Sequence, residues 1–169
     1  AHATAGADQR AMVRDVCQGG HGVALVVGRA GTGKTFALGM ARHAWQLDGY
    51  RLLAAAPTGI AAISLQGEGF EDVATCERLL ADLDRGHDQL DARTVLVIDE
   101  AGMLGSRKLT QLLEHAQAKV VLVGDDRQLA AIDAGGGFRA LRLRLGASEL
   151  TENRRQHQAW EREALELVR

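Results

Sequence analysis

The stretch "VALVVGRAGTGKT", residues 23–35, passes directly from an apolar run into a loop that contains three glycines and one lysine. Gly28, Gly33, Lys34 and Thr35 stand at the fixed positions of the pattern G-x-x-x-x-G-K-[ST]. An apolar, strand-like run precedes the pattern and a segment with helical spacing follows it, which is the context that it requires. Glycines let such a loop wrap tightly, so that its backbone N–H groups point inward at an anion. The stretch therefore predicts a phosphate-binding loop between a strand and a helix.

The residues of this loop are the types that hold a nucleoside triphosphate and its metal ion. The N–H groups of Gly31, Thr32 and Gly33 are expected to surround the phosphates, with the positive end of the following helix behind them. Lys34 supplies a point charge for the β- and γ-phosphates, and the Thr35 hydroxyl is a candidate ligand of Mg²⁺. ATP and Mg²⁺ are the predicted cofactors. The alternative is a glycine-rich turn with a solvated lysine, and the flanking strand and helix count against it.

The rest of the chain continues to alternate between two kinds of segment. Strands are predicted at residues 23–28, 51–56, 94–99, 119–124 and, from a weaker pattern, 146–150. Helices are predicted at residues 7–20, 33–49, 106–117 and 158–169. Nearly continuous apolar runs are typical of strands buried on both faces of a parallel sheet. We therefore predict one α/β domain over residues 1–169, with a mostly parallel sheet sandwiched between helices.

The predicted helix over residues 33–49 has apolar side chains at helical spacing. Phe36, Met40, Ala44 and Leu47 fall on one stripe of this helix. We expect this stripe to be the face that packs against the sheet.

Composition and charge exclude several classes of protein. The 169 residues are 46% hydrophobic and 25% charged, close to the globular average, so extensive disorder is not expected. The net charge of −2 provides no overall basic field, although a groove can still be locally basic. No apolar run approaches about 18 residues and no signal-peptide pattern is present, so we predict a cytoplasmic protein with no membrane partner. Because the chain begins with Ala1, we expect a fragment of a larger protein, monomeric by itself.

An acidic pair follows four apolar residues at the end of the third predicted strand. In "VLVIDEAGML" this pair is Asp99 and Glu100, the arrangement of a Walker B motif. The carboxyl ends of parallel strands border the crevice in which ligands bind, so both side chains are expected near the phosphate loop. Asp99 is predicted to hold Mg²⁺ together with Thr35, and Glu100 to take a proton from the attacking water. The alternative is an Asp that caps a helix with Glu in its first turn.

Three other strand ends are followed by polar segments. In "GDDRQL", the Gln128 amide can sense a γ-phosphate, and the alternative is a polar turn. In "LTENRRQ", either Arg154 or Arg155 can stabilise charge on the γ-phosphoryl group in the transition state, unless both are ordinary surface arginines. In "AAAPTGIAA", Thr58 is expected to cap a helix that begins near Gly59. The free N–H groups of that helix can hold a phosphate of a nucleic-acid backbone, and the alternative is capping alone.

The segments "GRAGTGKT", "APTGIAA", "VIDEAGM", "GDDRQL" and "LTENRRQ" occur in this order along the chain. Together they resemble domain 1A of the RecD-like branch of superfamily one DNA helicases. Within that branch the chain is similar to the helicase part of TraA/MobF-type conjugative relaxases, and "ATCERLLADLDRG" and "AGGGFRAL" add to this likeness. The resemblance covers nearly the whole chain. It implies a RecA-like P-loop NTPase fold, with residues 1–169 as a single RecA-like ATP-binding domain.

The resemblance also implies which side chains are catalytic. In the family an arginine directly precedes a glutamine in the fourth motif, and this selects Arg155 over its neighbour. Gln128 matches the glutamine that couples the γ-phosphate to DNA contacts. With Lys34 and Glu100, these two residues form the implied catalytic set.

Further positions match family residues that contact DNA or the base of the nucleotide. Pro57, Thr58 and Thr75 would contact single-stranded DNA, and the amide of Gln9 would read adenine. Asp126 departs from the family, which usually has Pro there, and "TCER" departs from a more apolar pattern after Thr75. The last two helicase motifs are not in this sequence, so a second RecA-like domain elsewhere in the same protein is an expected partner.

The predicted function is therefore that of the ATP-binding N-terminal motor domain of an ATP-dependent DNA helicase or translocase acting in conjugative DNA transfer. We expect the 169-residue chain to bind ATP but to hydrolyse it slowly. One alternative is a small P-loop kinase, which would need an acceptor pocket and an arginine-rich lid segment that the sequence does not display. The other is a nucleotide-binding assembly module without turnover, against which the complete set of Lys34, Asp99 and Glu100 argues.

Overall fold

The computed structural model of the chain describes residues 5–29, 31–117, 119–125 and 136–151. The strands are β1 (Val23–Gly28), β2 (Arg51–Ala56), β3 (Asp72–Thr75), β4 (Thr94–Ile98), β5 (Lys119–Gly124) and β6 (Ser148–Leu150). The helices are α1 (Ala7–Gln18), α2 (Lys34–Leu47), α3 (Gly59–Gly67), α4 (Cys76–Asp84), the 3-10 turn η1 (Ala101–Met103), α5 (Ser106–His115) and α6 (Gly137–Leu145).

The strands in the described residues form one six-stranded sheet in the order β3-β2-β4-β5-β1-β6. Every pairing in it is parallel. Strand β1 lies between β5 and β6, with Val23 opposite Val120 and Val26 opposite Ser148. Parallel neighbours need long crossover connections, and the helices between the strands supply them. The predicted α/β fold with a mostly parallel sheet is confirmed.

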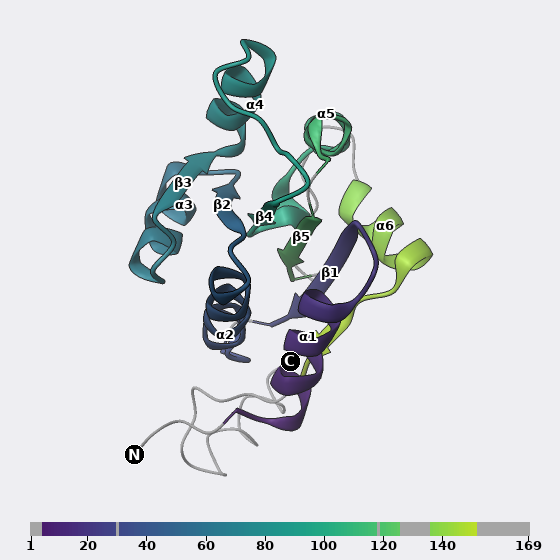
Figure 1. Cartoon of the computed structure of the whole chain (residues 1–169). Helices are drawn as coiled ribbons and strands as arrows, with labels where there is room; N and C mark the ends of the chain where they lie inside the picture. The colour runs from purple at the N-terminus through teal and green to yellow at the C-terminus, as the bar shows by residue number, and fades with distance from the viewer. Residues whose placement is uncertain (1–4, 30, 118, 126–135, 152–169) are drawn as a thin grey trace.

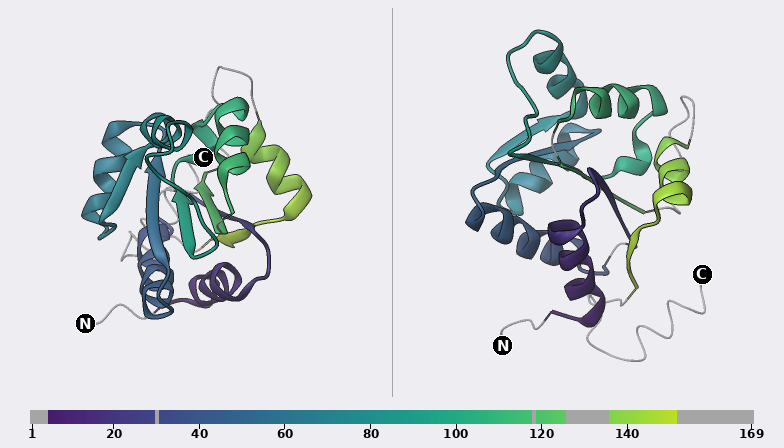
Figure 2. Two further views of the ribbon diagram at one scale, coloured as in Figure 1. Left: turned by 45° about the horizontal axis from the view of Figure 1, so that its top comes forward. Right: turned by 45° about the vertical axis from the view of Figure 1, so that its right-hand side comes forward.

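The sheet is the middle of three layers (Figures 1 and 2). Helices α1, α2 and α3 cover one face, and α4, α5 and α6 cover the other. Because side chains alternate along a strand, Leu96 and Val97 of β4 point into opposite cores. Trp45 of α2 lies in the same core as Val97, and Leu112 of α5 lies in the core of Leu96. This double burial explains why the central strands are nearly continuous apolar runs.

Helix α2 buries a different face from the one that the spacing predicted. Phe36 and Leu47 are 40% and 75% exposed. The buried face instead contains Ala37, Ala41 and Trp45. Small alanines let the helix backbone approach the sheet closely, and the indole fills the space at the far end of the helix. The stripe prediction was wrong for Phe36 and Leu47, whereas Met40 is partly buried and packs against the core. The spacing matched the helical period without weighing side-chain volume.

The structure also contains elements that the sequence patterns did not predict. One of them is β3, a four-residue edge strand without a buried residue. The others are helix α4, which follows β3, and helix α6, which precedes β6. Strand β6 is shorter than predicted, because it begins at Ser148. The predicted helix over residues 158–169 lies outside the described residues. Among the described helices, none is both long enough and apolar enough to cross a bilayer.

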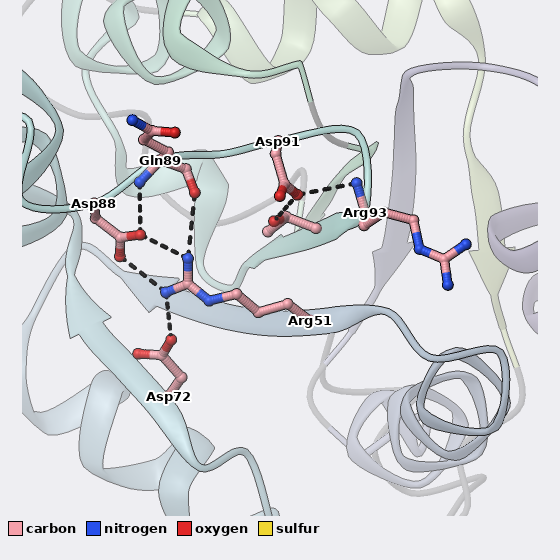
Figure 3. A network of polar contacts seen from close by, with 7 residues as sticks. Arg51, Asp72, Asp88, Gln89, Asp91 and Arg93 are labelled. Atoms are coloured by element: carbon pink, nitrogen blue, oxygen red, sulfur yellow. Dashed lines mark hydrogen bonds and ion pairs between the residues drawn. The ribbon is translucent and has the colours of Figure 1, made fainter.

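A network of ion pairs holds the edge of the sheet at which β2 and β4 begin (Figure 3). Arg51 donates to Asp88 Oδ1 at 2.6 Å and to Asp72 Oδ2 at 2.7 Å, so it ties the segment before β4 to the start of β3. Asp91 accepts hydrogen bonds from the Arg93 N–H and the Thr94 hydroxyl. The phosphate loop follows the opposite end of β1, so this network supports the fold at a distance from the predicted site.

Candidate nucleotide-binding site

The phosphate loop and the acidic pair lie at the same edge of the sheet. Gly28 ends β1 and leads into the loop, while Asp99 directly follows β4. The Asp99 N–H donates to the Ala55 carbonyl at 2.9 Å, so the backbone of Asp99 continues the pairing of β4 with β2. A Cβ added to Gly124, at the end of β5, would lie 3.3 Å from the Gly102 nitrogen, so the segment after β4 packs directly on the end of β5.

The backbone of the phosphate loop has the conformation that its glycines were expected to permit. Gly31 and Gly33 have φ angles of 87° and 78°, a region that side-chain-bearing residues rarely adopt. The Thr32 side chain is buried, and its hydroxyl donates to the Arg29 carbonyl at 2.8 Å. A Cβ at Gly28 would stand 2.7 Å from Thr32 Oγ1, so the loop folds back too closely for any larger residue there. The sequence pattern thus specifies a tight loop.

Lys34 and Thr35 form the first turn of α2, immediately after the loop. The Lys34 ammonium donates to the carbonyls of Gly28 at 2.5 Å and Arg29 at 3.3 Å, so its charge lies within the curve of the loop. The Thr35 side chain is exposed at the start of the helix. Both residues therefore lie where the N–H groups of the helix end are free to meet an anion.

Gln9 ties the first helix to this loop. Its side chain is only 1% exposed, and its Nε2 donates to the Gly33 carbonyl at 3.2 Å. Its Oε1 accepts from the Gly6 N–H at 3.0 Å. The structure thus places Gln9 against the phosphate loop, with both ends of its amide bonded inside the protein. Its predicted contact with adenine remains a prediction.

The acidic pair has two distinct environments. Burial raises the pKa of the Asp99 carboxyl, while a hydrogen bond from the Glu100 N–H at 2.8 Å and the nearby Lys34 charge lower it. Glu100 has φ 50° and ψ 32°, the left-handed region, and no other non-glycine residue in the described ranges has a positive φ. Such strain is uncommon outside functional sites. The 3-10 turn that follows Glu100 is too short to count as the α-helix of the capping alternative.

The structure adds one acidic residue to the site that no sequence pattern indicated. Glu68 follows α3, and the Thr35 hydroxyl donates to its Oε1 at 2.8 Å. Burial raises the pKa of the Glu68 carboxyl and the Asp99 charge raises it further, while the Thr35 hydrogen bond and the Lys34 charge lower it. Glu68 therefore bonds to one predicted metal ligand, Thr35, and interacts electrostatically with the other, Asp99. Its position 33 residues after Thr35 gave no signal in the sequence.

A family model described as an AAA domain matches residues 4–169. The chain belongs to the AAA domain family. Conjugal transfer protein TraA of Agrobacterium fabrum is 44% identical to it over 151 residues, which are 87% of this chain and 14% of that protein. The ATP-dependent RecD2 DNA helicase of Deinococcus radiodurans is 32% identical over 143 residues, which are 81% of this chain and 20% of that protein.

The AAA domain described here thus spans 14–20% of the length of these two relatives. The predicted likeness to TraA and to RecD-like proteins is confirmed. Pif1 helicase from Candida albicans has a TM-score of 0.71 at 20% identity, over 98% of this chain and 43% of that one. Bacteroides Pif1 bound to single-stranded DNA has a TM-score of 0.64 at 20% identity, over 98% and 46%. At this identity the likeness concerns the fold alone, and the AAA domain has the predicted RecA-like fold.

The oxygen atoms at this edge of the AAA domain fit a magnesium ion. Mg²⁺ prefers oxygen ligands, and Thr35 and Asp99 offer a hydroxyl and a carboxylate. Thr35 donates a hydrogen bond to Glu68, and the charge of Asp99 raises the pKa of the Glu68 carboxyl. Glu68 Oε2 is buried and has no hydrogen-bond partner in the described part of the chain. A buried carboxylate oxygen without a partner is costly unless a cation is nearby.

The predicted DNA-contact residues are helix caps in this structure. Thr58 Oγ1 accepts from the Ala61 N–H at 3.2 Å and caps α3. Thr75 Oγ1 accepts from the Arg78 N–H at 3.2 Å and caps α4. The predicted capping by Thr58 is therefore confirmed, while the DNA contacts of Pro57, Thr58 and Thr75 remain predictions.

Two predicted catalytic residues, Gln128 and Arg155, lie outside the described residues, as do Arg154 and Asp126. The described strand β5 ends at Gly124, four residues before Gln128. Their proposed roles rest on the sequence patterns alone.

Proposed function

We propose that this chain is the ATP-binding motor domain of an ATP-dependent DNA helicase or translocase that acts in conjugative DNA transfer. The observation that supports this most directly is the meeting of the phosphate loop and the acidic pair at one edge of the parallel sheet. The likeness to TraA over 87% of the chain favours the conjugative context. The likeness to the RecD2 DNA helicase favours a motor over other nucleotide-binding enzymes.

In the proposed reaction, the N–H groups of Gly31 to Lys34 and the positive end of α2 hold the phosphates of ATP. The Lys34 ammonium exchanges its carbonyl partners for phosphate oxygens, which are stronger acceptors because they are charged. Thr35 and Asp99 would hold Mg²⁺, which supplies charge neutralisation to the triphosphate.

Glu100 is proposed as the residue that takes a proton from the attacking water. Its backbone is held in a strained conformation directly after Asp99, which fixes the direction in which its side chain leaves the chain. A carboxylate can accept a proton from water as the bond from the water oxygen to the γ-phosphorus forms and the bond to the leaving ADP breaks. Gln128 and Arg155 are proposed to contact the γ-phosphoryl group.

The proposed nucleic-acid partner is single-stranded DNA. The first N–H groups of α3 and α4 are natural donors to phosphates, and Thr58 and Thr75 lie at these two helix starts. A second RecA-like domain of the same protein is proposed to complete the catalytic site and the DNA track. Residues 1–169 are proposed to be one domain of that longer protein.

The test is the ATPase activity of a longer form of the protein that contains this domain, with and without single-stranded DNA. We expect DNA to stimulate turnover. Glu100→Gln should abolish turnover and retain ATP binding, whereas Lys34→Ala should weaken ATP binding itself. Stimulation by a small metabolite instead of DNA would indicate a kinase. Nucleotide binding without turnover under any condition would indicate an assembly module, and either result would overturn the proposal.

A further inference from the structure

Glu68 is an acidic side chain at the nucleotide site to which no motif assigns a role. Helix α3 runs from Gly59 to Gly67, and Glu68 is the residue at which it ends. The Glu68 N–H bonds to carbonyls of the last turn, including those of Ser64 and Leu65. These backbone bonds end the helix without help from the carboxylate, so capping does not explain where the side chain lies.

We propose that Glu68 is a positioning residue that orients the Thr35 hydroxyl for Mg²⁺. This inference rests on the proposed function and refines its metal site. It assigns Glu68 no direct bond to the metal. Glu68 acts through Thr35, in the way that second partners of metal ligands fix the orientation and basicity of those ligands.

The chemistry of a hydroxyl group explains why such a partner is needed. A threonine hydroxyl has one hydrogen to donate and two lone pairs to offer. It can ligate a cation only when the hydrogen points elsewhere. In this structure the hydrogen of Thr35 is donated to Glu68 Oε1 at 2.8 Å, so the lone pairs are free to face another direction. The negative acceptor also polarises the O–H bond and makes the oxygen a better ligand.

The segment that follows Glu68 is held against helix α2. Arg42, two turns after Thr35 on α2, donates to the Gly69 carbonyl at 2.8 Å. The same guanidinium lies 6.0 Å from the centre of the Phe70 ring. The segment after α3 is therefore fixed against the helix that carries Thr35, and Glu68 is fixed with it.

The second oxygen of the Glu68 carboxylate is a separate indication that a cation binds nearby. Glu68 Oε2 is buried and has no hydrogen-bond partner among the described residues. Asp99 contributes a second negative charge and Lys34 a positive one to the same surroundings. A buried oxygen without a partner, on a carboxylate that also interacts with the Asp99 charge, is unfavourable in the protein by itself, and a divalent cation held by Thr35 and Asp99 would relieve it.

The test compares nucleotide binding with and without metal. Dissociation constants for ATP are measured by titration calorimetry in MgCl₂ and again in EDTA, and their ratio is the metal advantage. Glu68→Ala should reduce the metal advantage by about ten-fold or more, the usual loss when a partner of a metal ligand is removed. Its affinity in EDTA should not fall, because removing a negative charge that interacts with Lys34 does not weaken the attraction for the phosphates. Glu68→Gln keeps a neutral acceptor for the Thr35 hydroxyl and should retain an intermediate advantage.

Two comparisons separate this role from a structural one. Glu71→Ala removes an exposed carboxylate three residues away and should leave both affinities unchanged. Thr35→Val removes the hydroxyl itself, so adding Glu68→Ala to Thr35→Val should cost nothing further if Glu68 acts through Thr35. An additive loss in the double variant would overturn the proposal. So would equal losses in MgCl₂ and in EDTA, which would indicate damage to the loop.

Different results would contradict the nucleotide site and the role of Glu68. If the wild-type chain does not bind ATP at all, the nucleotide site is wrong. If the wild type binds ATP with a clear metal advantage and Glu68→Ala keeps that advantage, only the role of Glu68 is wrong. Glu68→Ala removes one hydrogen bond from Thr35 together with an oxygen that has no partner among the described residues, so we expect little change in fold stability, and thermal melting of each variant checks this.

Discussion

The left-handed backbone of Glu100 leads to a prediction about stability as well as function. Replacement by Gly and replacement by Ala both remove the carboxylate. The difference between the two variants in free energy of unfolding therefore reports the effect of the backbone conformation alone. At φ 50° and ψ 32°, a residue with a Cβ is strained by about 1–2 kcal/mol, and glycine is not. Against this, glycine loses about 0.4–1 kcal/mol more in conformational entropy than alanine on folding. We therefore expect Glu100→Gly to be more stable than Glu100→Ala by about 1 kcal/mol.

Urea unfolding followed by circular dichroism measures this difference. With a slope of about 2–3 kcal/mol/M, the Gly variant should have a midpoint about 0.3–0.5 M higher than the Ala variant. Its melting temperature should be about 2–4 °C higher. The matched control is Glu114, an exposed residue in helix α5, where the order should reverse because Gly costs about 1 kcal/mol relative to Ala in a helix. If the Ala variant at position 100 is as stable as the Gly variant, the backbone of Glu100 is not strained.

Three further predictions concern other residues of the domain. Gln9→Ala leaves the Gly33 carbonyl without its buried partner, so the free energy of unfolding measured in urea should fall by about 1–3 kcal/mol. An unchanged free energy of unfolding would show that this hydrogen bond does not stabilise the loop. Thr58→Asp keeps a cap for α3 but repels phosphates, so in a longer form of the protein it should weaken DNA binding at near wild-type melting temperature, whereas Thr58→Ser should do neither. The hydrogen bond from Arg51 lowers the pKa of Asp88 in the folded protein. An aspartate in the unfolded chain has a pKa of about 4, so Asp88 stabilises the fold fully above that pH. This stabilisation is lost as the pH falls through the lower pKa of the folded protein. Asp88→Asn should therefore cost about 0.5–1 kcal/mol at pH 7, with the difference vanishing in acid, and a pH-independent difference would exclude the ion pair as its cause.

Local patterns were sufficient to predict the elements that form the site. The apolar runs before Gly28 and Asp99 are long because both faces of their strands are buried, and this double burial is visible in the sequence. The glycines of the phosphate loop are required by the positive φ angles of Gly31 and Gly33. Such features follow from residue type and near neighbours, so a single sequence contains them.

Features that depend on distant contacts were not predicted. Strand β3 has four residues and no buried one, and only its pairing with β2 makes it a strand. Glu68 reaches Thr35 because the segment that follows α3 lies against α2, and this contact leaves no periodic signal. The buried face of α2 was predicted wrongly for a related reason. The position of Trp45 depends on the volume available between the helix and the sheet.

The place of β1 in the sheet has a consequence for how this domain is made. The strand that leads into the phosphate loop pairs with β5 and β6, and Val23 meets Val120 almost a hundred positions further along the chain. During synthesis β1 therefore emerges long before its neighbours exist, and contacts of such large sequence separation form slowly. The ability to bind a nucleotide should consequently arise late, when the two ends of the domain have met, and acquisition of ATP affinity during refolding would report completion of the whole sheet.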